Sequence, residues 1–418
     1  MTLETRAVSD CRKRVVIVTP GQLGSNPRVV KEADTLHMSG YDVEVIATKL
    51  ADFVEPRDQS IMAAAPWRLK RVTFDNRWLW RLGRSLQIVA RLLRTFTPSR
   101  RLDMLALSPM SRHLVRAASA RSADLFIAHY PAALPAAAAA ARRHGTQYAY
   151  DAEDFHLGEW PDDPAYDTER RLVHAIEGRY LPSCAYVTAA SPLIAEALVE
   201  TYGIEPPHVV LNVFPRSQAP AAPTTQGSAA PRPSLYWFSQ TIGPNRGLEC
   251  AVRAIGLSAY RPHLYLRGTP AVGYVAQLEK IAGETGAQGR VHVLPPASPD
   301  QMENLAAHHD LGLASEVPVS RNREVCLTNK LFSFLLAGLP PLMSATPAQR
   351  RFAAESGLAD LVYPVDDAPA LAALIDRLLS APDGLASLRE QIWRLGQERY
   401  NWDVERNLIR SAIQGIKC

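Results

Sequence analysis

The sequence predicts an α/β protein built from two doubly wound domains, and three observations support that prediction. Short β-branched or aromatic runs alternate with amphipathic runs along most of the 418 residues, which is the pattern of parallel sheets covered by helices. The alternation stops once, in a proline-rich stretch, and then resumes. The length is sufficient for two cores of ordinary domain size.

The first domain is expected over residues 13–214. Its opening strand is the run RVVIVTP at 14–20, and an amphipathic run at 29–40 follows a glycine-containing loop. Gly40 is expected to end that helix. The later strands are expected at 41–48, 124–128, 147–150, 184–189 and 208–211, with helices at 132–144 and 192–202. Strand, helix and strand in succession predict a doubly wound parallel sheet.

A linker is expected over residues 215–233, because this stretch holds five prolines that stiffen it. The second domain is then expected over 234–395. Its strands are expected at 235–238, 263–266, 290–294, 311–314 and 341–344, with helices at 247–255, 272–285 and 299–308. The stretch 384–416 is helical by pattern, and residues 396–418 are expected to form a separate C-terminal segment.

The composition excludes several classes of protein. Hydrophobic residues make up 47% and charged residues 21%, which is unlike a disordered chain or a collagen-like fibre. The cysteines are odd in number and widely spaced, namely Cys11, Cys184, Cys250, Cys326 and Cys418. They favour a reducing compartment over a disulfide framework. The first residues lack the apolar run of a secretory signal, so we expect a cytoplasmic protein.

The loop PGQLGSNPR at 20–28 is the first candidate binding element. Gly21 and Gly24 allow a tight turn and a close approach to a ligand, and Ser25 or Asn26 can cap the helix that follows. Free N–H groups and the helix dipole there favour an anion or a sugar hydroxyl. The alternative is an ordinary strand–helix turn, because neither the P-loop pattern nor GxGxxG is present.

Two further elements in the second domain suit a phosphate. Arg246 stands where a loop leads into a helix, so it could pair with a diphosphate or lie on the surface in solvent. In TNKLFSFLLAG at 328–338, Thr328 or Asn329 caps a helix whose first turn carries Lys330. N–H groups and an ammonium group therefore converge at that helix tip, although the apolar residues behind it also predict a core helix.

Together these segments resemble the glycosyltransferase-B fold, in particular the nucleotide-sugar-dependent family 4-like enzymes. The segments that carry the likeness are, in order, SNPRVVKEADTLHMSGYDVEVI, DAEDFH, VVLNVFP, GPNRGLE and NKLFSFLLAGLPPLM. The resemblance implies two Rossmann-like domains that face each other across a cleft, with the acceptor in the N-terminal domain and the nucleotide sugar in the C-terminal domain. It also implies that the last helix, within 396–418, crosses back onto the first domain.

The resemblance assigns roles to the donor-site residues. It places Gly24 near the donor phosphates or sugar, Arg246 on the diphosphate, and Asn329 and Lys330 at the helix tip that faces the phosphates. Gly268 would lie beside the nucleotide.

Ser333 marks a departure from the family. Related enzymes usually carry two glutamates, one on the donor sugar and one on the ribose. Here Ser333 stands at the second position, and the first falls near Val325, with Glu316 and Glu324 as the nearest acids. We keep Ser333 among the donor-site residues. The departure motivates one alternative, a non-catalytic partner protein; the other alternative is a sugar-nucleotide epimerase of the same fold.

The segment YDAEDFH at 150–156 follows an expected strand and supplies the catalytic candidates. Glu153, Asp154 or His156 could orient a sugar or accept a proton from an acceptor hydroxyl. The same residues could instead form an acidic loop that caps a helix. His129, at the end of another expected strand, is a further candidate, although a lone histidine there is more often structural.

A basic stretch spans residues 68–121, where thirteen Arg and Lys residues face only Asp75 and Asp103. Within it, one face of 78–96 is apolar at helical spacing: Trp78, Leu82, Leu86, Val89, Leu93 and Phe96. This segment could contact an anionic membrane surface. Alternatively, the apolar stripe packs on the domain and the arginines are in solvent. No nucleic-acid partner is expected, because no recognised nucleic-acid module accompanies the charge.

The combined expectation is a glycosyltransferase with a nucleoside-diphosphate sugar as donor substrate and no cofactor or metal. Its acceptor would be a glycan or a lipid-linked glycan in cell-surface polysaccharide or glycoconjugate synthesis, on the inner face of the plasma membrane if the basic stretch binds lipid. Retention of anomeric configuration is implied by the resemblance alone.

Overall fold

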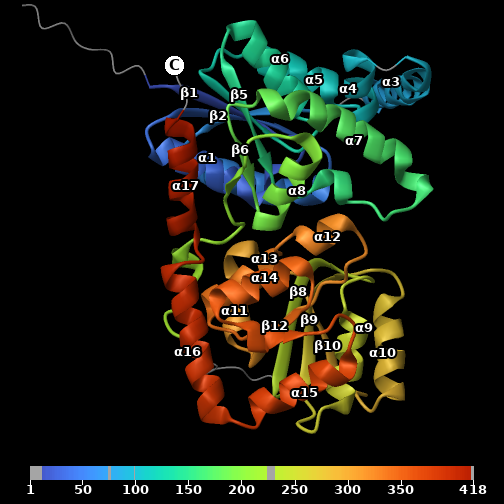
Figure 1. Cartoon of the computed structure of the whole chain (residues 1–418), viewed down its shortest axis with the longest axis vertical. Coiled ribbons are helices and arrows are strands. Elements are labelled where there is room, and N and C mark those ends of the chain that lie inside the picture. The colour runs from blue at the N-terminus through green and yellow to red at the C-terminus, as the bar shows by residue number, and fades with distance from the viewer. Residues whose placement is uncertain (1–11, 74–76, 98, 224–230, 416–418) are drawn as a thin grey trace, which may run out of the picture.

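A computed structural model describes residues 12–73, 77–97, 99–223 and 231–415. Two α/β domains lie one above the other, and a pair of helices near the C-terminus runs along one side of both (Figure 1). This architecture confirms the expected fold class of two parallel-sheet, Rossmann-like domains. The tail 416–418 and the linker residues 224–230 lie outside the described part of the chain.

The N-terminal domain holds a seven-stranded parallel sheet of order β3-β2-β1-β4-β5-β6-β7. Its strands are β1 Arg14–Val18, β2 Asp42–Thr48, β3 Arg68–Val72, β4 Leu125–His129, β5 Gln147–Ala152, β6 Val187–Ala189 and β7 His208–Val209. Its helices are α1 Pro27–Met38, α2 Glu55–Ala64, α3 Arg77–Phe96, α4 Arg100–Leu107, α5 Ser111–Ser119, α6 Leu134–His144, α7 Asp167–Tyr180 and α8 Pro192–Tyr202. The central strands β1 and β4 are almost fully buried, as expected of a sheet covered on both faces.

The C-terminal domain holds a six-stranded parallel sheet of order β10-β9-β8-β11-β12-β13. Its strands are β8 Ser234–Ile242, β9 His263–Pro270, β10 Val291–Leu294, β11 Leu311–Ala314, β12 Pro341–Ser344 and β13 Val362–Tyr363. Its helices are α9 Leu248–Leu257, α10 Tyr274–Glu284, α11 Met302–Ala307, α12 Arg321–Val325, α13 Asn329–Ala337, α14 Pro347–Ser356, α15 Ala368–Leu379 and α16 Pro382–Glu398.

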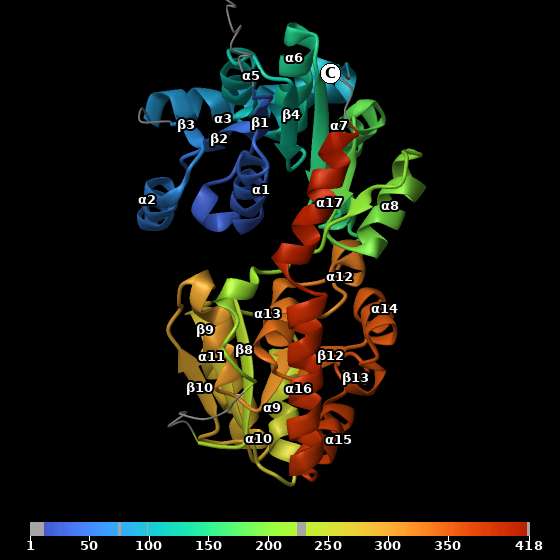
Figure 2. The same cartoon turned by 90° about the vertical axis from the view of Figure 1, so that its left-hand side faces the viewer.

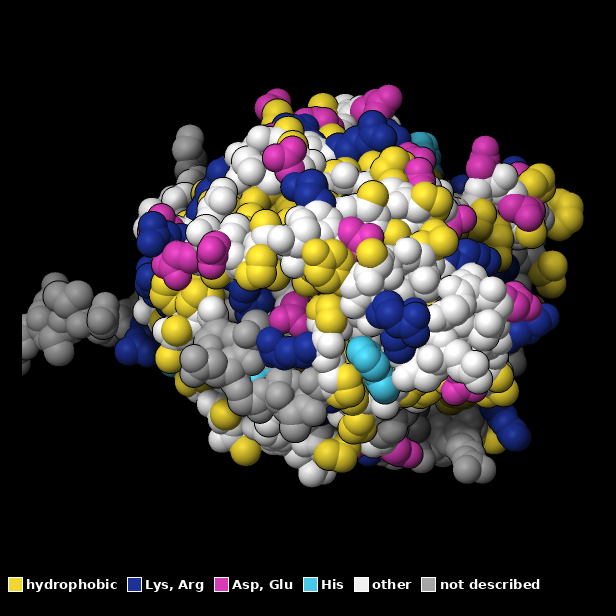
Figure 3. All heavy atoms as spheres, turned by 90° about the horizontal axis from the view of Figure 1, so that it is seen from below, with side chains coloured by type: hydrophobic (Ala, Val, Ile, Leu, Met, Phe, Trp, Pro, Cys, Tyr) yellow, Lys and Arg dark blue, Asp and Glu magenta, His cyan; other side chains and the backbone are white. Residues whose placement is uncertain are grey.

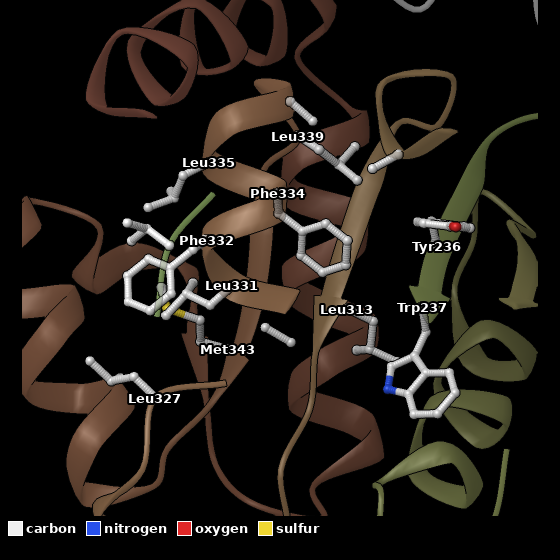
Figure 4. Packing of buried hydrophobic residues seen from close by; sticks show 14 of the residues in the cluster. Tyr236, Trp237, Leu313, Leu327, Leu331, Phe332, Phe334, Leu335, Leu339 and Met343 are labelled. Atoms are coloured by element: carbon white, nitrogen blue, oxygen red, sulfur yellow. The ribbon is translucent and has the colours of Figure 1, made fainter. Parts of the chain in front are cut away.

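Helix α13 is anchored in the core of the C-terminal domain. The ring of Phe334 lies edge-on to Phe238 at 5.7 Å and to Tyr236 at 6.4 Å between centroids. Figure 4 shows Phe334 directed toward the strand that carries Tyr236 and Trp237, whereas Phe332 points to the other side of the helix. Apolar contact on both sides fixes the axis of α13, and therefore the position of its N-terminal tip.

The chain returns to the first domain at its end. Helix α16 packs on the C-terminal domain, and after a short break the last helix, α17 Trp402–Gln414, packs on α1 (Figure 2). The indole N–H of Trp402 donates to Thr35 Oγ1 at 3.0 Å, and Glu405 accepts from the Leu211 N–H at 2.7 Å. The expected crossing of the last helix is confirmed.

Some elements were not predicted from the sequence. Strand β3 lies inside the basic stretch, and its residues RLKRV alternate between exposed and half-buried positions up to the buried Val72. It is an edge strand, so it lacks the continuous apolar run that marks the central strands. The short strand β13 and the helices α2, α4, α5, α7, α12, α14 and α15 were also missed.

Candidate active site at the domain interface

A buried glutamate after β11 gathers two cations. The Glu316 side chain is 1% exposed and accepts from Lys330 Nζ at 2.8 Å and from Arg323 at 2.9 Å. Burial alone would raise its pKa, but Lys330 and Arg323 outweigh burial and hold the pKa of Glu316 below its ordinary value. Glu316 is therefore a carboxylate that fixes both cations in position.

Arg246 brings a third positive charge to the same place. It lies in the loop between β8 and α9, and its backbone carbonyl accepts from Ser315 Oγ at 2.6 Å. Burial and the nearby Arg323 lower the pKa of Arg246, while Glu316 acts in the opposite direction. Two cations thus pair with one carboxylate and a third lies near them, and the excess of positive charge suits a bound anion. The pairing of Arg323 with Glu316 was not predicted from the sequence. The signal that could have pointed to Glu316 is its position just after a strand, because ligands bind at the carboxyl ends of the strands in such sheets.

The tip of α13 adds hydrogen-bond donors to these cations. Thr328 is the residue before the first helical turn, and its buried hydroxyl has no hydrogen-bond partner in the described part of the chain. Asn329 begins the helix, and Lys330 projects over the Trp237 ring with Nζ 5.5 Å from its centroid. Unpaired N–H groups and the dipole of a helix N-terminus favour an anion at this point.

Ser333, one turn further along α13, binds a carboxylate from another helix. Its hydroxyl donates to Glu303 Oε1 at 2.6 Å, and Glu303 on α11 is fully buried. The second oxygen of Glu303 has no partner in the described residues. Burial raises the pKa of Glu303 to about 7, against the lowering effect of the Ser333 hydrogen bond. Helix α13 carries a serine where related enzymes usually carry a glutamate, but a glutamate from α11, Glu303, lies beside that serine.

The N-terminal domain contributes an edge of polar groups after β5. Glu153 accepts from Asn212 Nδ2 at 2.6 Å and lies 3.4 Å from the Tyr130 hydroxyl. Burial and the adjacent Asp154 raise the pKa of Glu153. Tyr130 has a φ of 67°, a strained backbone conformation for a bulky residue and a common mark of a functional position. Sequence reasoning missed Tyr130, because strain is not visible in the residue order.

Asp154 lies at the contact between the domains. Asn322, on α12 of the C-terminal domain, donates to Asp154 Oδ1 at 2.8 Å and accepts from the Phe155 N–H at 2.8 Å. The next residue in the chain is Arg323, which binds Glu316. One short helix therefore connects the catalytic candidates of the first domain to the cation cluster of the second.

His156 is buried beside this contact. Its Nδ1 lies 2.6 Å from Glu159, and its Nε2 has no partner in the described residues. The ring centroids of His156 and Tyr130 lie 5.3 Å apart, and the two rings are tilted by 48°. Burial lowers the pKa of His156, but Glu159 outweighs it and raises the pKa to about 9. Protonated His156 can orient Tyr130 rather than act as a base near neutral pH.

His129 belongs to a separate, fully buried network. Its ring nitrogens lie 2.5 Å from Glu32 and 3.2 Å from Asp151, and Arg28 binds Asp151 through two hydrogen bonds of 2.7 Å. Burial opposes the charge on His129, but the two carboxylates raise its pKa to about 10. Because both nitrogens are engaged, the geometry favours a structural role for His129 over the catalytic role that we predicted.

The polar groups of the first glycine loop form hydrogen bonds within the protein. The N–H of Gly24 donates to Asp58 Oδ1 at 2.7 Å, and a methyl group at Gly24 would lie 2.8 Å from Val54. Gly21 donates to its neighbour Thr19, and the Ser25 hydroxyl donates to Gln22. Asn26, not Ser25, caps α1. The structure thus gives Gly24 a packing reason in place of the predicted contact with the donor.

The backbone conformation and close packing also explain why a glycine stands at position 268. It holds a φ of 150° in β9, and a side chain there would lie 2.3 Å from the Ser239 carbonyl oxygen. Glycine permits the close approach of β8 and β9 at an irregular point of their register.

Comparison with known proteins agrees with this geometry. Residues 23–213 match the family model of the glycosyl transferase 4-like domain. The structure of Anabaena HepE in complex with UDP and glucose matches with a TM-score of 0.71 and 16% identity, over 97% of this chain and 100% of that chain. Sucrose-phosphate synthase from Thermosynechococcus elongatus matches with a TM-score of 0.67 and 13% identity, over 96% and 98%.

A glycosyltransferase from Rickettsia africae also matches, with a TM-score of 0.66 and 11% identity over 97% of this chain and 99% of that one. No curated protein sequence matches the chain. The fold and the arrangement of its two domains are those of the glycosyltransferase-B fold. The family match covers the N-terminal domain alone, which is similar to the glycosyl transferase 4-like domain.

Proposed function

We propose that the protein transfers a sugar from a nucleoside-diphosphate sugar to a glycan or lipid-linked acceptor, in the synthesis of cell-surface polysaccharide or glycoconjugates. The observation that carries this proposal is the excess of positive charge at the tip of α13, where Lys330 and Arg323 both pair with Glu316 and Arg246 lies near them. The matched HepE structure contains UDP and glucose, which supports a nucleotide sugar as the donor.

The cation cluster would act on the leaving group. When the bond between the sugar and the diphosphate breaks, negative charge grows on the diphosphate. Preorganised cations and helix N–H groups stabilise that charge without rearranging. We propose that Arg246, Arg323 and Lys330 perform this task in place of a metal ion, with no other cofactor and with retention of configuration at the sugar.

The polar edge after β5 would hold the acceptor. Glu153 has a raised pKa and lies near the Tyr130 hydroxyl, so it can accept a proton from an acceptor hydroxyl while Tyr130 binds the oxygen of that hydroxyl. Asp154, held by Asn322, would keep this edge against the donor domain.

Glu303 would take the place of the glutamate that related enzymes usually carry at the position of Ser333. Its second carboxylate oxygen is free of partners in the described residues, and the first is held by the Ser333 hydroxyl. A carboxylate is a good acceptor for the hydroxyls of a ribose. We expect the ribonucleotide to bind more tightly than its 2′-deoxy form, and Glu303→Gln to remove that preference.

Calorimetric titration with UDP, GDP, ADP, TDP and CMP tests the donor site. One nucleoside diphosphate is expected to bind, and Arg323→Gln is expected to weaken it about 10- to 100-fold, the cost of one charge-assisted hydrogen bond. Arg321→Gln is the matched control: Arg321 lies on the same helix, the substitution removes the same charge, and among the described residues the ion pair of Arg321 is with Glu324. Equal affinity for both variants would refute the assigned role of the cluster.

Product analysis separates the two alternatives. An epimerised sugar nucleotide formed without any acceptor would establish the epimerase, and nucleotide binding without turnover on any glycan would favour the non-catalytic partner. We place the protein in the cytoplasm. In the described residues, no helix is long and apolar enough to cross a membrane, so a lipid-linked acceptor would require a surface contact, for which residues 68–121 are the candidate.

A further inference from the structure

Helix α3 exposes to solvent the apolar face that an ordinary surface helix buries. Eight of its large apolar side chains are exposed: Trp78, Trp80, Leu82, Ile88, Val89, Leu92, Leu93 and Phe96. The exposed fractions reach 63% for Leu92 and 85% for Phe96. A surface helix normally turns such a face toward the core, and a contiguous exposed apolar face marks an interaction site.

The inward face of α3 is small and polar. Gln87 donates to the Ala106 carbonyl at 3.1 Å, and Ala90 is 2% exposed against α4. Arg91 pairs with Glu169 at 2.9 Å, and Arg94 pairs with the buried Asp103 at 2.7 Å. The structure therefore contradicts the alternative in which the apolar stripe packs on the domain and all the arginines are in solvent. Two of the arginines point inward instead and hold the apolar face outward.

The charge around the apolar face is of one sign. The segment 77–102 contains no Asp or Glu. Arg81 and Arg84 on α3, and Arg100 and Arg101 at the start of α4, are exposed and form no ion pair with any described residue. By contrast, acidic and basic side chains are interspersed on the end of the molecule seen in Figure 3. A second copy of the chain would bring arginines against arginines, whereas an anionic surface attracts them.

We propose that the outward face of α3 is a membrane-docking surface for anionic lipid. A helix of 20 residues is about 30 Å long and would lie in the plane of the headgroups. Its apolar side chains would enter the acyl boundary, and the arginines would meet lipid phosphates. Aromatic side chains near both ends, Trp78 and Phe96, suit the interface.

The place of α3 in the fold fits this role. In both views α3 lies at the edge of the N-terminal domain that is far from the C-terminal domain (Figures 1 and 2). Docking there would bring the proposed acceptor domain to the bilayer and leave the donor domain free of it. The docking surface is independent of the transfer reaction and deepens the proposed function only by supplying a surface for a lipid-linked acceptor.

Flotation with vesicles of stated composition tests the proposal in the absence of substrates. The full chain is expected to float with phosphatidylcholine vesicles containing 30% phosphatidylglycerol and not with pure phosphatidylcholine. Leu92→Ser with Phe96→Ser is expected to lower the partition at least tenfold, and Arg100→Glu with Arg101→Glu to lower it more steeply at low salt than at high salt. The control variant, Leu257→Ser with Val272→Ser, replaces two exposed apolar side chains on the C-terminal domain. It is expected to leave flotation unchanged.

Three outcomes would overturn the proposal. These are equal flotation of the Leu92, Phe96 variant and the wild type, absence of flotation with anionic vesicles, and a dimer in solution that the same two substitutions dissociate. The last would assign the face to a second copy of the chain. Nucleotide titration of the Leu92, Phe96 variant keeps the two proposals apart, because unchanged nucleotide affinity with lost flotation concerns the docking surface alone.

Discussion

Each domain gathers charged side chains at the carboxyl ends of its strands, but the two groups are balanced differently. In the N-terminal domain, Arg28 and His129 face Asp151 and Glu32, so two cations meet two carboxylates. In the C-terminal domain, two cations, Lys330 and Arg323, pair with the one carboxylate of Glu316, and Arg246 lies near them. In a balanced buried network, every charged group has a partner of opposite charge within the protein. An unbalanced network requires an anion from outside, which is why we assign the ligand site to the second group.

The largest expected effect comes from disturbing the balanced network. Asp151→Asn would remove the acid that pairs with both Arg28 and His129 and would leave both cations buried, and we expect the free energy of unfolding to fall by about 3–5 kcal/mol. Chemical denaturation measures this loss. Glu390→Gln breaks an exposed pair with Arg394 and is expected to cost less than about 1 kcal/mol. A loss for Asp151→Asn as small as that of the control would contradict a structural role for the network.

The pH dependence of Glu303 comes next. Burial raises its folded pKa from 4.5 to about 7, so its protonated form stabilises the fold. That contribution is complete below pH 4.5 and is lost as the pH rises to about 7. Relative to Glu303→Gln, which stays neutral, the wild type should lose about 3 kcal/mol of stability over this range. The exposed Glu284, which pairs with Lys280, gives the control, because Glu284→Gln is expected to cost less than about 1 kcal/mol.

A smaller effect is expected when the unbalanced group is made more positive. Glu316→Gln removes the acid that competes with a ligand for Lys330 and Arg323. We expect the nucleoside diphosphate to bind about tenfold more tightly, which is about 1.4 kcal/mol. The melting temperature should therefore rise more on nucleotide addition than it does for the wild type. Loss of the nucleotide response in this variant would show that Glu316 itself is needed for binding.

The smallest expected effect concerns the glycine loop of the N-terminal domain. Gly24→Ala would place a methyl group 2.8 Å from Val54 and 3.0 Å from Asp58. Val54 can move, so we expect a cost of about 1 kcal/mol. At Gly21 the nearest atom is 3.6 Å away, and Gly21→Ala should be nearly neutral. Thermal unfolding of the two variants compares them directly. If Gly24→Ala weakens nucleotide binding without lowering stability, the loop is a ligand site after all.

The sequence predicted the strands of both sheets that are buried on two faces, because a continuous apolar run identifies them without tertiary information. It also predicted that Lys330 and Arg246 lie at the ends of connecting loops. It could not show that Asp58 would occupy the Gly24 loop, or that Glu32 and Asp151 would enclose His129. Those partners come from distant elements, and their approach depends on how the helices pack.

The same limit applies to Ser333 and to α3. The residue order shows a serine where a glutamate is usual, but only the packing of α11 shows that Glu303 reaches the same place. For α3 the periodicity predicted an amphipathic helix correctly, and it left open which face turns outward. The ion pairs of Arg91 and Arg94 decide that orientation, because Glu169 and Asp103 lie on other helices.

Helix α17 sets the order in which the molecule can be completed during synthesis. It is made after every other element described, yet it packs on α1, which is made long before it, and Trp402 donates to Thr35. The N-terminal domain therefore leaves the ribosome with the apolar surface under α17 uncovered, and it stays so until the whole C-terminal domain has been translated. A fragment that ends at the linker would keep that surface open. Supplying residues 396–415 as a separate chain should restore its solubility.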